Sequence, residues 1–153
     1  MRSAVGPAPS RATVIHDAAL PQAMVHGAER SLSRAGFFVA GVEVDADEGN
    51  KTLRRLEAIL SCMAAHKHER HDPVVALGGG VVGDLAGFAA GVHRRGVPLV
   101  QCPTTLLAMV DASVGGKVGV DTALGKNLVG AFHPPAIVVA DPLTLLSLPD
   151  RVY

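Results

Sequence analysis

Short apolar runs alternate with longer stretches of helical periodicity along most of this chain. Each apolar run is rich in Val or Ile and has about the usual length of a β-strand. The runs are ATVIH (12–16), GFFVAGVEV (36–44), PVVAL (73–77), VPLVQC (97–102) and AIVVA (136–140). Between them, residues 21–35 and 51–66 carry helical periodicity. This alternation is typical of a parallel sheet that is covered by helices.

Residues 81–92 predict a third helix, which contains an unusual stripe of glycines. Gly83, Gly87 and Gly91 recur every four residues and so lie on one face. Each glycine should cost the helix about 1 kcal/mol relative to alanine. We therefore expect another element to pack closely against this bare backbone.

A glycine-rich turn joins the third apolar run to this helix. Gly78, Gly80 and Gly83 have the GxGxxG spacing, directly after a strand and at the start of a helix. Free backbone amides and the helix dipole would face an anion there, so the turn predicts dinucleotide binding, with a plain tight turn as the alternative. The acid that usually holds the adenine ribose is missing from VQCPTTLL downstream. The predicted fold is α/β and Rossmann-like, with helices on both faces of a parallel sheet.

Length and composition limit the classes of function. A chain of 153 residues with 48% apolar side chains can bury one core, so we expect one domain over 12–153 after a disordered lead-in over 1–11. Fourteen basic and fourteen acidic side chains cancel and aromatic residues are few, so nucleic acid is not an expected partner. No apolar run suits a membrane span or a secretory signal. Cys62 and Cys102 fit buried thiols in a reducing compartment, which predicts a cytoplasmic protein.

Residues 103–127, PTTLLAMVDASVGGKVGVDTALGKN, are predicted to form a long loop, and long loops in compact α/β domains are often functional. Thr104 and Thr105 would offer hydroxyl groups at the carboxyl end of a strand, unless they only cap the turn. Lys117, Lys126 and Asn127 would converge on a carboxylate or a phosphate. The alternative is a set of solvated surface charges.

Other polar clusters have simpler interpretations. The run DADEGNK, with Glu48 and Lys51, fits a solvated helix cap, and Asp84 fits a partner for the dipole in the first turn of its helix. The histidines of HKHERHD (66–72) fit a solvated helix end better than a zinc site, because no cysteine or carboxylate set completes a standard spacing. We therefore expect no metal ligands in this chain.

Residues 73–150 resemble the cofactor-binding half of the 3-dehydroquinate synthase family. The resemblance rests on ALGGGVVGDLAGFAA, on RRGVPLVQCPTTLLAMVDASVGGKVGVDTALGKNLVGAFHPP and on LTLLSLP, in the family's order and spacing. It implies a lyase of the shikimate pathway to aromatic amino acids. Such an enzyme converts a sugar acid phosphate, 3-deoxy-D-arabino-heptulosonate 7-phosphate, into 3-dehydroquinate and phosphate. Bound NAD would take a hydride from a ring carbinol and return it later in the cycle.

The resemblance also implies roles for individual residues. Glu48 and Lys51 would hold the adenosine end of NAD and so supply the missing ribose partner. Other cofactor contacts would come from Asp17, Gly79, Gly80, Val81, Gly83, Asp84, Thr104, Thr105, Leu107, Thr144 and Ser147. Cofactor and substrate would meet at four catalytic positions, of which the lysines also contact NAD: Asp111, Lys117, Lys126 and Asn127. Arg95, also counted as catalytic, would reach the site of a neighbouring subunit, which implies a homodimer.

Some features depart from the family pattern. Ser147 replaces the usual Thr but keeps a hydroxyl group, and Ala19 removes one polar cofactor neighbour. The helical C-terminal domain, whose ligands would hold zinc or cobalt in the intact enzyme, has no counterpart in these 153 residues. The hydride step would then lack Lewis acid assistance, so we expect the chain alone to be inactive, as a fragment or as one part of a split enzyme.

Two alternatives to a 3-dehydroquinate synthase stay open. Another sugar phosphate cyclase, of the 2-deoxy-scyllo-inosose or valiolone type, would share NAD and metal but act on another sugar phosphate. VDASVGGKVGV followed by LGKNLVGAFHPP resembles the dehydroquinate pattern better. A non-catalytic nucleotide-binding remnant would keep the cofactor site without the chemistry.

Overall fold

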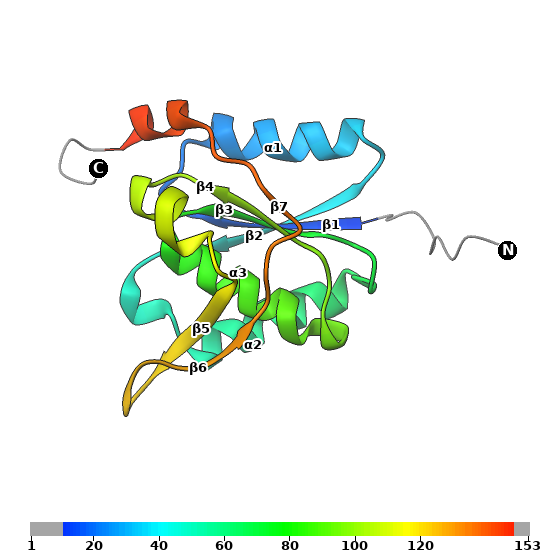
Figure 1. Ribbon diagram of the computed structural model, residues 1–153. Coiled ribbons are helices and arrows are strands. Elements are labelled where there is room, and N and C mark those ends of the chain that lie inside the picture. Colours follow the sequence, from blue (N-terminus) through cyan, green and yellow to red (C-terminus); the bar gives the residue numbers. More distant parts are fainter. Residues whose placement is uncertain (1–10, 149–153) are drawn as a thin grey trace, which may run out of the picture.

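The computed structural model describes residues 11–148, and a five-stranded parallel sheet forms its centre (Figure 1). The strands lie in the order β2-β1-β3-β4-β7, and all neighbouring pairs are parallel. They span Arg11–Asp17 (β1), Phe38–Val44 (β2), Val74–Gly78 (β3), Leu99–Pro103 (β4) and Ile137–Val138 (β7). All five predicted strands are confirmed, with their ends shifted by no more than two residues.

Helices cover both faces of this sheet, as predicted. One face carries α1 (Gln22–Arg34), and the other carries α2 (Leu53–Ala65) and α3 (Gly80–Val92) (Figure 1). In the central strands β1 and β3, neighbouring residues point to opposite faces, and both faces are buried. In β1, Val14 packs in the apolar cluster on the α1 side, whereas Ile15 packs in the larger cluster with α2 and α3. Burial on both faces explains why these central strands are continuous apolar runs rather than alternating ones.

The sequence also sets the start and the buried face of α2. Thr52 is its N-cap, and the Oγ1 atom accepts a hydrogen bond from the N–H of Arg55 at 3.3 Å. Such a cap stabilises a helix by about 1 kcal/mol. Leu56, Ile59 and Met63 are its buried residues, and they pack into the larger cluster.

The glycine stripe of α3 is covered closely, as expected. A Cβ atom on Gly83 would lie 3.1 Å from the Oε1 atom of Gln101 in β4. A Cβ atom on Gly87 would clash with the Cγ1 atom of Val118, and Gly91 faces the segment that follows β6. The close approach of these segments offsets the helix-forming cost of the glycines.

The prediction of a long loop over residues 103–127 is wrong. Its first part contains a π-helical turn, η3 (Ala108–Ala112). Its second part begins an antiparallel hairpin of β5 (Lys117–Thr122) and β6 (Gly125–Phe132), drawn in yellow and orange in Figure 1. The hairpin is anchored because Val118 and Val120 are buried in the cluster that contains α3.

Short helical turns complete the described chain: η1 (Glu48–Asn50), η2 (His93–Arg95) and η4 (Pro142–Ser147). Arg11 already belongs to β1, and the rest of the predicted lead-in lies outside the described residues, as do residues 149–153. Cys62 and Cys102 are free and half-buried, so the prediction of buried thiols is wrong. None of the helices within residues 11–148 has the length and apolar character needed to cross a membrane.

Candidate functional site

The carboxyl ends of the strands form the edge at which open α/β sheets bind ligands. Because β1 lies between β2 and β3, the strand order reverses at β1, and such a reversal leaves a crevice between the outgoing loops. Asp17 ends β1 at this edge, and its Oδ1 atom accepts the N–H of Ala19 at 2.9 Å. The loops that follow β2, β3 and β4 carry most of the other predicted site residues to the same edge.

The glycine turn leaves the N-terminus of α3 open. Gly79 is the N-cap residue, and no side chain caps the first amides of the helix. These N–H groups form the positive end of the helix dipole, which suits an anion. Gly78 serves packing instead, because a Cβ atom there would lie 2.8 Å from the Cγ2 atom of Val82. The glycines therefore divide into two that pack the helix, Gly78 and Gly83, and two that leave its amides bare, Gly79 and Gly80.

The two threonines after β4 stand beside this helix start. Thr104 is buried, and its N–H donates to a carbonyl of the glycine turn at 3.0 Å. The Oγ1 atom of Thr105 accepts the N–H of Ala108 at 3.2 Å, so this side chain does cap a turn. The Cγ2 atom of Thr105 would lie 3.3 Å from a Cβ atom on Gly79. Val81 packs partly against the core.

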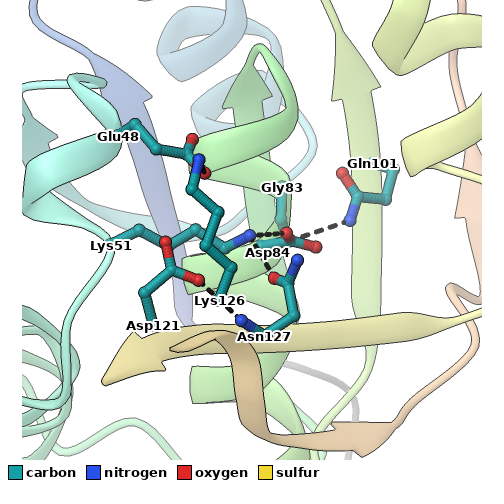
Figure 2. A network of polar contacts seen from close by, with 8 residues as sticks. All are labelled: Glu48, Lys51, Gly83, Asp84, Gln101, Asp121, Lys126 and Asn127. Carbon is teal, nitrogen blue, oxygen red and sulfur yellow. Dashed lines mark hydrogen bonds and ion pairs between the residues drawn. The ribbon is translucent and has the colours of Figure 1, made fainter. Parts of the chain in front are cut away.

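A buried lysine joins three segments next to the glycine turn (Figure 2). The Nζ atom of Lys51 lies 2.5 Å from the Oδ2 atom of Asp84 and donates to the Oδ1 atom of Asn127 at 2.5 Å. Only 4% of Lys51 is exposed. The predicted cap accounts for Asp47, whose Oδ1 atom accepts the N–H of Gly49 at 2.7 Å, but it does not account for Lys51. Lys51 instead ties the loop after β2 to α3 and β6.

The electrostatics of the site centre on Asp84. The helix α3 begins at Gly80 and has no acid in its first turn, so the predicted role of Asp84 as a dipole partner there is wrong. Its partner is Lys51. Burial raises the pKa of Asp84 above its ordinary value of 3.8, while the hydrogen bond and charge of Lys51 lower it. The negative charges of Glu48 and Asp121 add to the upward shift.

Two further polar residues belong to this network and were not predicted from the sequence. The Oδ1 atom of Asp121 accepts the N–H of Asn127 at 2.7 Å, and the Nε2 atom of Gln101 donates to the carbonyl of Gly83 at 3.2 Å (Figure 2). Gln101 carried a signal, because a polar residue inside an apolar strand needs a hydrogen-bond partner. Asp121 carried no such signal in the sequence, because it lies in a segment that was expected to be a loop.

The structure does not bring Lys117 and Lys126 to one cavity. Lys126 lines a cavity of about 770 Å³ beside Glu48, whose Oε1 atom lies 3.2 Å from the Nζ atom of Lys126. Lys117 lines a separate cavity of about 510 Å³. The predicted residues around the second cavity are Asp84, Asp111, Lys117 and Asn127. This cavity therefore combines two acids with two groups that can donate hydrogen bonds to an anion.

Several predicted residues lie apart from these cavities. Thr144 and Ser147 donate their hydroxyl groups to backbone carbonyls around η4, at 2.7 and 2.6 Å. Leu107 is 69% exposed. Arg95 is exposed just beyond the C-terminal end of α3. A helix of 13 residues spans about 20 Å, so Arg95 lies far from the glycine turn at the other end.

The prediction that the histidine run is a solvated helix end is only partly confirmed. His66 and His71 are exposed, but His68 is buried. The Nε2 atom of His68 donates to the carbonyl of Asp72 at 2.8 Å, and its Nδ1 atom lies 2.9 Å from the Oγ1 atom of Thr13. Burial lowers the pKa of His68 below 6.5. Within residues 11–148, no three His, Cys, Asp or Glu side chains are placed to hold a metal ion together.

Comparisons with known proteins agree on the fold and the family. A model of the family described as 3-dehydroquinate synthase N-terminal matches residues 41–153. The 3-dehydroquinate synthase of Symbiobacterium thermophilum is 52% identical over 145 residues, which is 95% of this chain and 40% of that protein. The one of Gloeobacter violaceus is 56% identical over 122 residues, which is 80% of this chain and 34% of that protein.

Among solved structures, 2-deoxy-scyllo-inosose synthase complexed with carbaglucose-6-phosphate, NAD+ and Co2+ has a TM-score of 0.88 and 34% identity, over 94% of this chain and 39% of that one. ValA, a 2-epi-5-epi-valiolone synthase from Streptomyces hygroscopicus with NAD+ and Zn2+ bound, has a TM-score of 0.83 and 33% identity, over 95% of this chain and 41% of that one. The chain thus spans about two fifths of the length of these relatives. It belongs to the 3-dehydroquinate synthase family, whose N-terminal part it matches.

Proposed function

We propose that this chain forms the NAD-binding part of a 3-dehydroquinate synthase, a cyclase that releases phosphate. The complete enzyme would convert 3-deoxy-D-arabino-heptulosonate 7-phosphate into 3-dehydroquinate and phosphate. The observation that carries the proposal is the uncapped N-terminus of α3 beside the cluster of Lys51, Asp84 and Asn127. The names of the sequence relatives support the reaction, and the NAD+ complexes of two related cyclases support the cofactor.

The residues of this edge fit a dinucleotide. The bare amides at the start of α3 would bind the pyrophosphate, where Gly79 and Gly80 add no side chain in the way. The exposed carboxylate of Glu48, in the loop after β2, would accept the ribose hydroxyl groups. When bound, NAD would accept a hydride from the substrate and later return it. Lys51, pinned between Asp84 and Asn127, would hold the cofactor-binding segments in place.

The cavity of about 510 Å³ fits the substrate end of the site. Lys117 and the amide of Asn127 would donate hydrogen bonds to phosphate or carboxylate oxygens, and Asp111 would accept from sugar hydroxyl groups. A zinc or cobalt ion, such as the metals in the two related cyclase structures, would need ligands from outside residues 11–148. Arg95 is not among the residues that line this cavity, so in a homodimer it would serve the other subunit's site.

A charge placed at the start of α3 tests the cofactor site without disturbing the fold. A Cβ atom on Gly80 would lie 3.7 Å from the Cβ atom of Ala112, an ordinary contact, so Gly80→Asp can start a side chain there without a clash at Cβ. An acid in the first turn also favours the helix. Its carboxylate would compete with pyrophosphate for the same amides, so we expect NAD to bind at least about tenfold more weakly, measured by calorimetric titration.

The matched control is Gly80→Ala, which adds the Cβ atom without the charge and should bind NAD within about threefold of the unmodified chain. Thermal unfolding of both variants would show that the fold is kept. If the unmodified chain bound no NAD, the proposal would be rejected. If it bound NAD and the sugar phosphate of another cyclase in preference to the heptulosonate phosphate, a different cyclase would be indicated.

A further inference from the structure

Asp121 occupies a position in the site that no assigned role explains. It lies in β5, and its backbone N–H donates to the carbonyl of Lys51 at 2.8 Å. Its side chain accepts the N–H of Asn127 at 2.7 Å, across the turn of the hairpin (Figure 2). One residue thus contacts both members of the Lys51–Asn127 hydrogen bond, through two different groups.

Asn127 has a backbone conformation that needs support. Its φ angle is +54°, in the left-handed region that residues other than glycine adopt only at a cost in free energy. A hydrogen bond from a backbone N–H to a carboxylate is stronger than one between neutral groups. The Asp121 carboxylate therefore favours this conformation over the extended one that a β-strand would impose.

The conformation of Asn127 decides where its side chain points. In the left-handed conformation, its Oδ1 atom accepts the Nζ hydrogen of Lys51, which is in turn paired with Asp84 (Figure 2). The amide of Asn127 then also lines the cavity of about 510 Å³. A change of the Asn127 backbone would withdraw one of the two partners of a lysine that is 4% exposed.

We infer that Asp121 is a positioning residue of the cofactor and substrate site. It acts through Asn127, whose backbone it fixes, and thereby holds Lys51 and Asp84 in place for the ligands. This role rests on the proposed function, because it presupposes that NAD binds at this edge. Asp121 itself lines the other cavity, beside Lys126, and needs no contact with NAD for this role.

Two substitutions separate the acceptor from the charge of Asp121. Asp121→Ala removes the acceptor for the N–H of Asn127, whereas Asp121→Asn keeps an oxygen in that place. The backbone hydrogen bond to Lys51 survives in both, because it does not involve the side chain. We expect Asp121→Ala to weaken NAD binding about tenfold and Asp121→Asn to bind within about threefold of the unmodified chain. The measurement is calorimetric titration of the folded chain with NAD.

A double substitution shows whether the effect passes through Asn127. Asn127→Gly tolerates the positive φ angle but removes the amide side chain. In that background, Asp121→Ala should change NAD affinity by less than about twofold, because the side chain it positions is already absent. A merely structural role would weaken binding equally in both backgrounds.

The outcomes also distinguish this inference from the proposed function. Absence of NAD binding by the unmodified chain would reject the proposed function. Tight NAD binding by both the unmodified chain and Asp121→Ala would overturn the positioning role alone. Equal losses in Asp121→Ala and Asp121→Asn would likewise overturn it, because they would assign the effect to the charge rather than to the hydrogen bond.

Discussion

At the residue scale, the Lys51–Asp84 pair is less exposed than the Lys126–Glu48 pair. The side chains of Lys51 and Asp84 are 5% and 19% exposed, so water solvates neither charge well. The attraction across 2.5 Å and the additional hydrogen bond to Asn127 offset this loss of hydration. Removal of either partner would leave the other as an unpaired, poorly hydrated charge.

We expect Lys51→Met to lower the free energy of unfolding by about 2 kcal/mol, somewhat less than for a fully buried pair because Asp84 keeps some contact with water. The same change should raise the pKa of Asp84 further, because Lys51 is the group that lowers it. Chemical denaturation would measure the first effect, and carboxyl-carbon NMR of Asp84 would measure the second.

The matched control for this substitution is Lys126→Met. Lys126 also pairs with an acid, Glu48, but both side chains are largely exposed. An exposed pair contributes about 0–1 kcal/mol, so this variant should unfold almost as the unmodified chain does. Equal losses for the two variants would show that burial does not strengthen the Lys51–Asp84 pair.

Residue types in the site could be predicted from the sequence, but their contacts could not. Glu48, Lys51 and Asp84 were each identified as polar residues near the start of a predicted helix, and each alone fits a solvated helix terminus. Only the fold brings Asp84 of α3 to Lys51, which lies 33 positions earlier in the chain. The same reason hides Asp121, whose importance depends on the left-handed backbone of Asn127.

At the scale of elements, the packing of the hairpin on α3 depends on the glycine stripe. A Cβ atom on Gly87 would clash with Val118 and would lie 3.3 Å from the Cδ2 atom of Leu99. We therefore expect Gly87→Ala to destabilise the chain by about 1–3 kcal/mol, even though alanine favours a helix. Because the site residues of β5 and β6 move with the hairpin, NAD affinity should fall as well.

The comparison for this substitution is Gly27→Ala in the middle of α1. A Cβ atom on Gly27 would meet nothing within 4 Å, so only helix propensity changes there. That variant should gain about 1 kcal/mol of stability. Thermal unfolding would give both values, and a gain for Gly87→Ala would contradict the close packing of β5 against α3.

The elements differ in how far the sequence predicts them. The strands of the parallel sheet are continuous apolar runs, and α2 has a capped start and one apolar face, so local patterns suffice. In the hairpin, Gly119 and Gly130 interrupt the alternation of apolar and polar residues. They are needed because the two backbones approach closely there, and a Cβ atom on Gly130 would clash with the carbonyl of Val118. Because this close approach involves two strands, the apolar pattern of either strand alone does not indicate it.

At the scale of the whole molecule, the two ends of the sheet are built differently. The carboxyl end gathers the charged and partly open site, whereas the amino end holds a hydrogen-bond network around the buried ring of His68. The ring of His68 forms hydrogen bonds with the Oγ1 atom of Thr13 in β1 and with the carbonyl of Asp72, which precedes β3. The backbone carbonyl of His68 accepts a hydrogen bond from the Nε2 atom of His93 at 3.0 Å. The network therefore joins the starts of two central strands to the end of α3.

Because burial disfavours its charged form, His68 should make stability depend on pH. Its pKa is lowered in the fold by burial and by His93, although Asp72 and Glu69 oppose the shift. Below about pH 6.5 the unfolded chain binds a proton that the folded chain does not, so the free energy of unfolding must fall as the pH falls. The slope due to this group can reach about 1.4 kcal/mol per pH unit, until the folded pKa is also passed.

Chemical denaturation at several pH values between about 5 and 8 would isolate this contribution, since that range spans the ordinary pKa of histidine. His68→Gln should be less stable at high pH, because it loses the paired ring, but its stability should fall less steeply as the pH is lowered. His71→Gln is the control, since His71 is exposed in the same run and should leave the slope unchanged. If the free energy of unfolding of His68→Gln fell with pH as steeply as that of the unmodified chain, the acid sensitivity would originate in other groups. Protonation of His68 would then make no contribution to it.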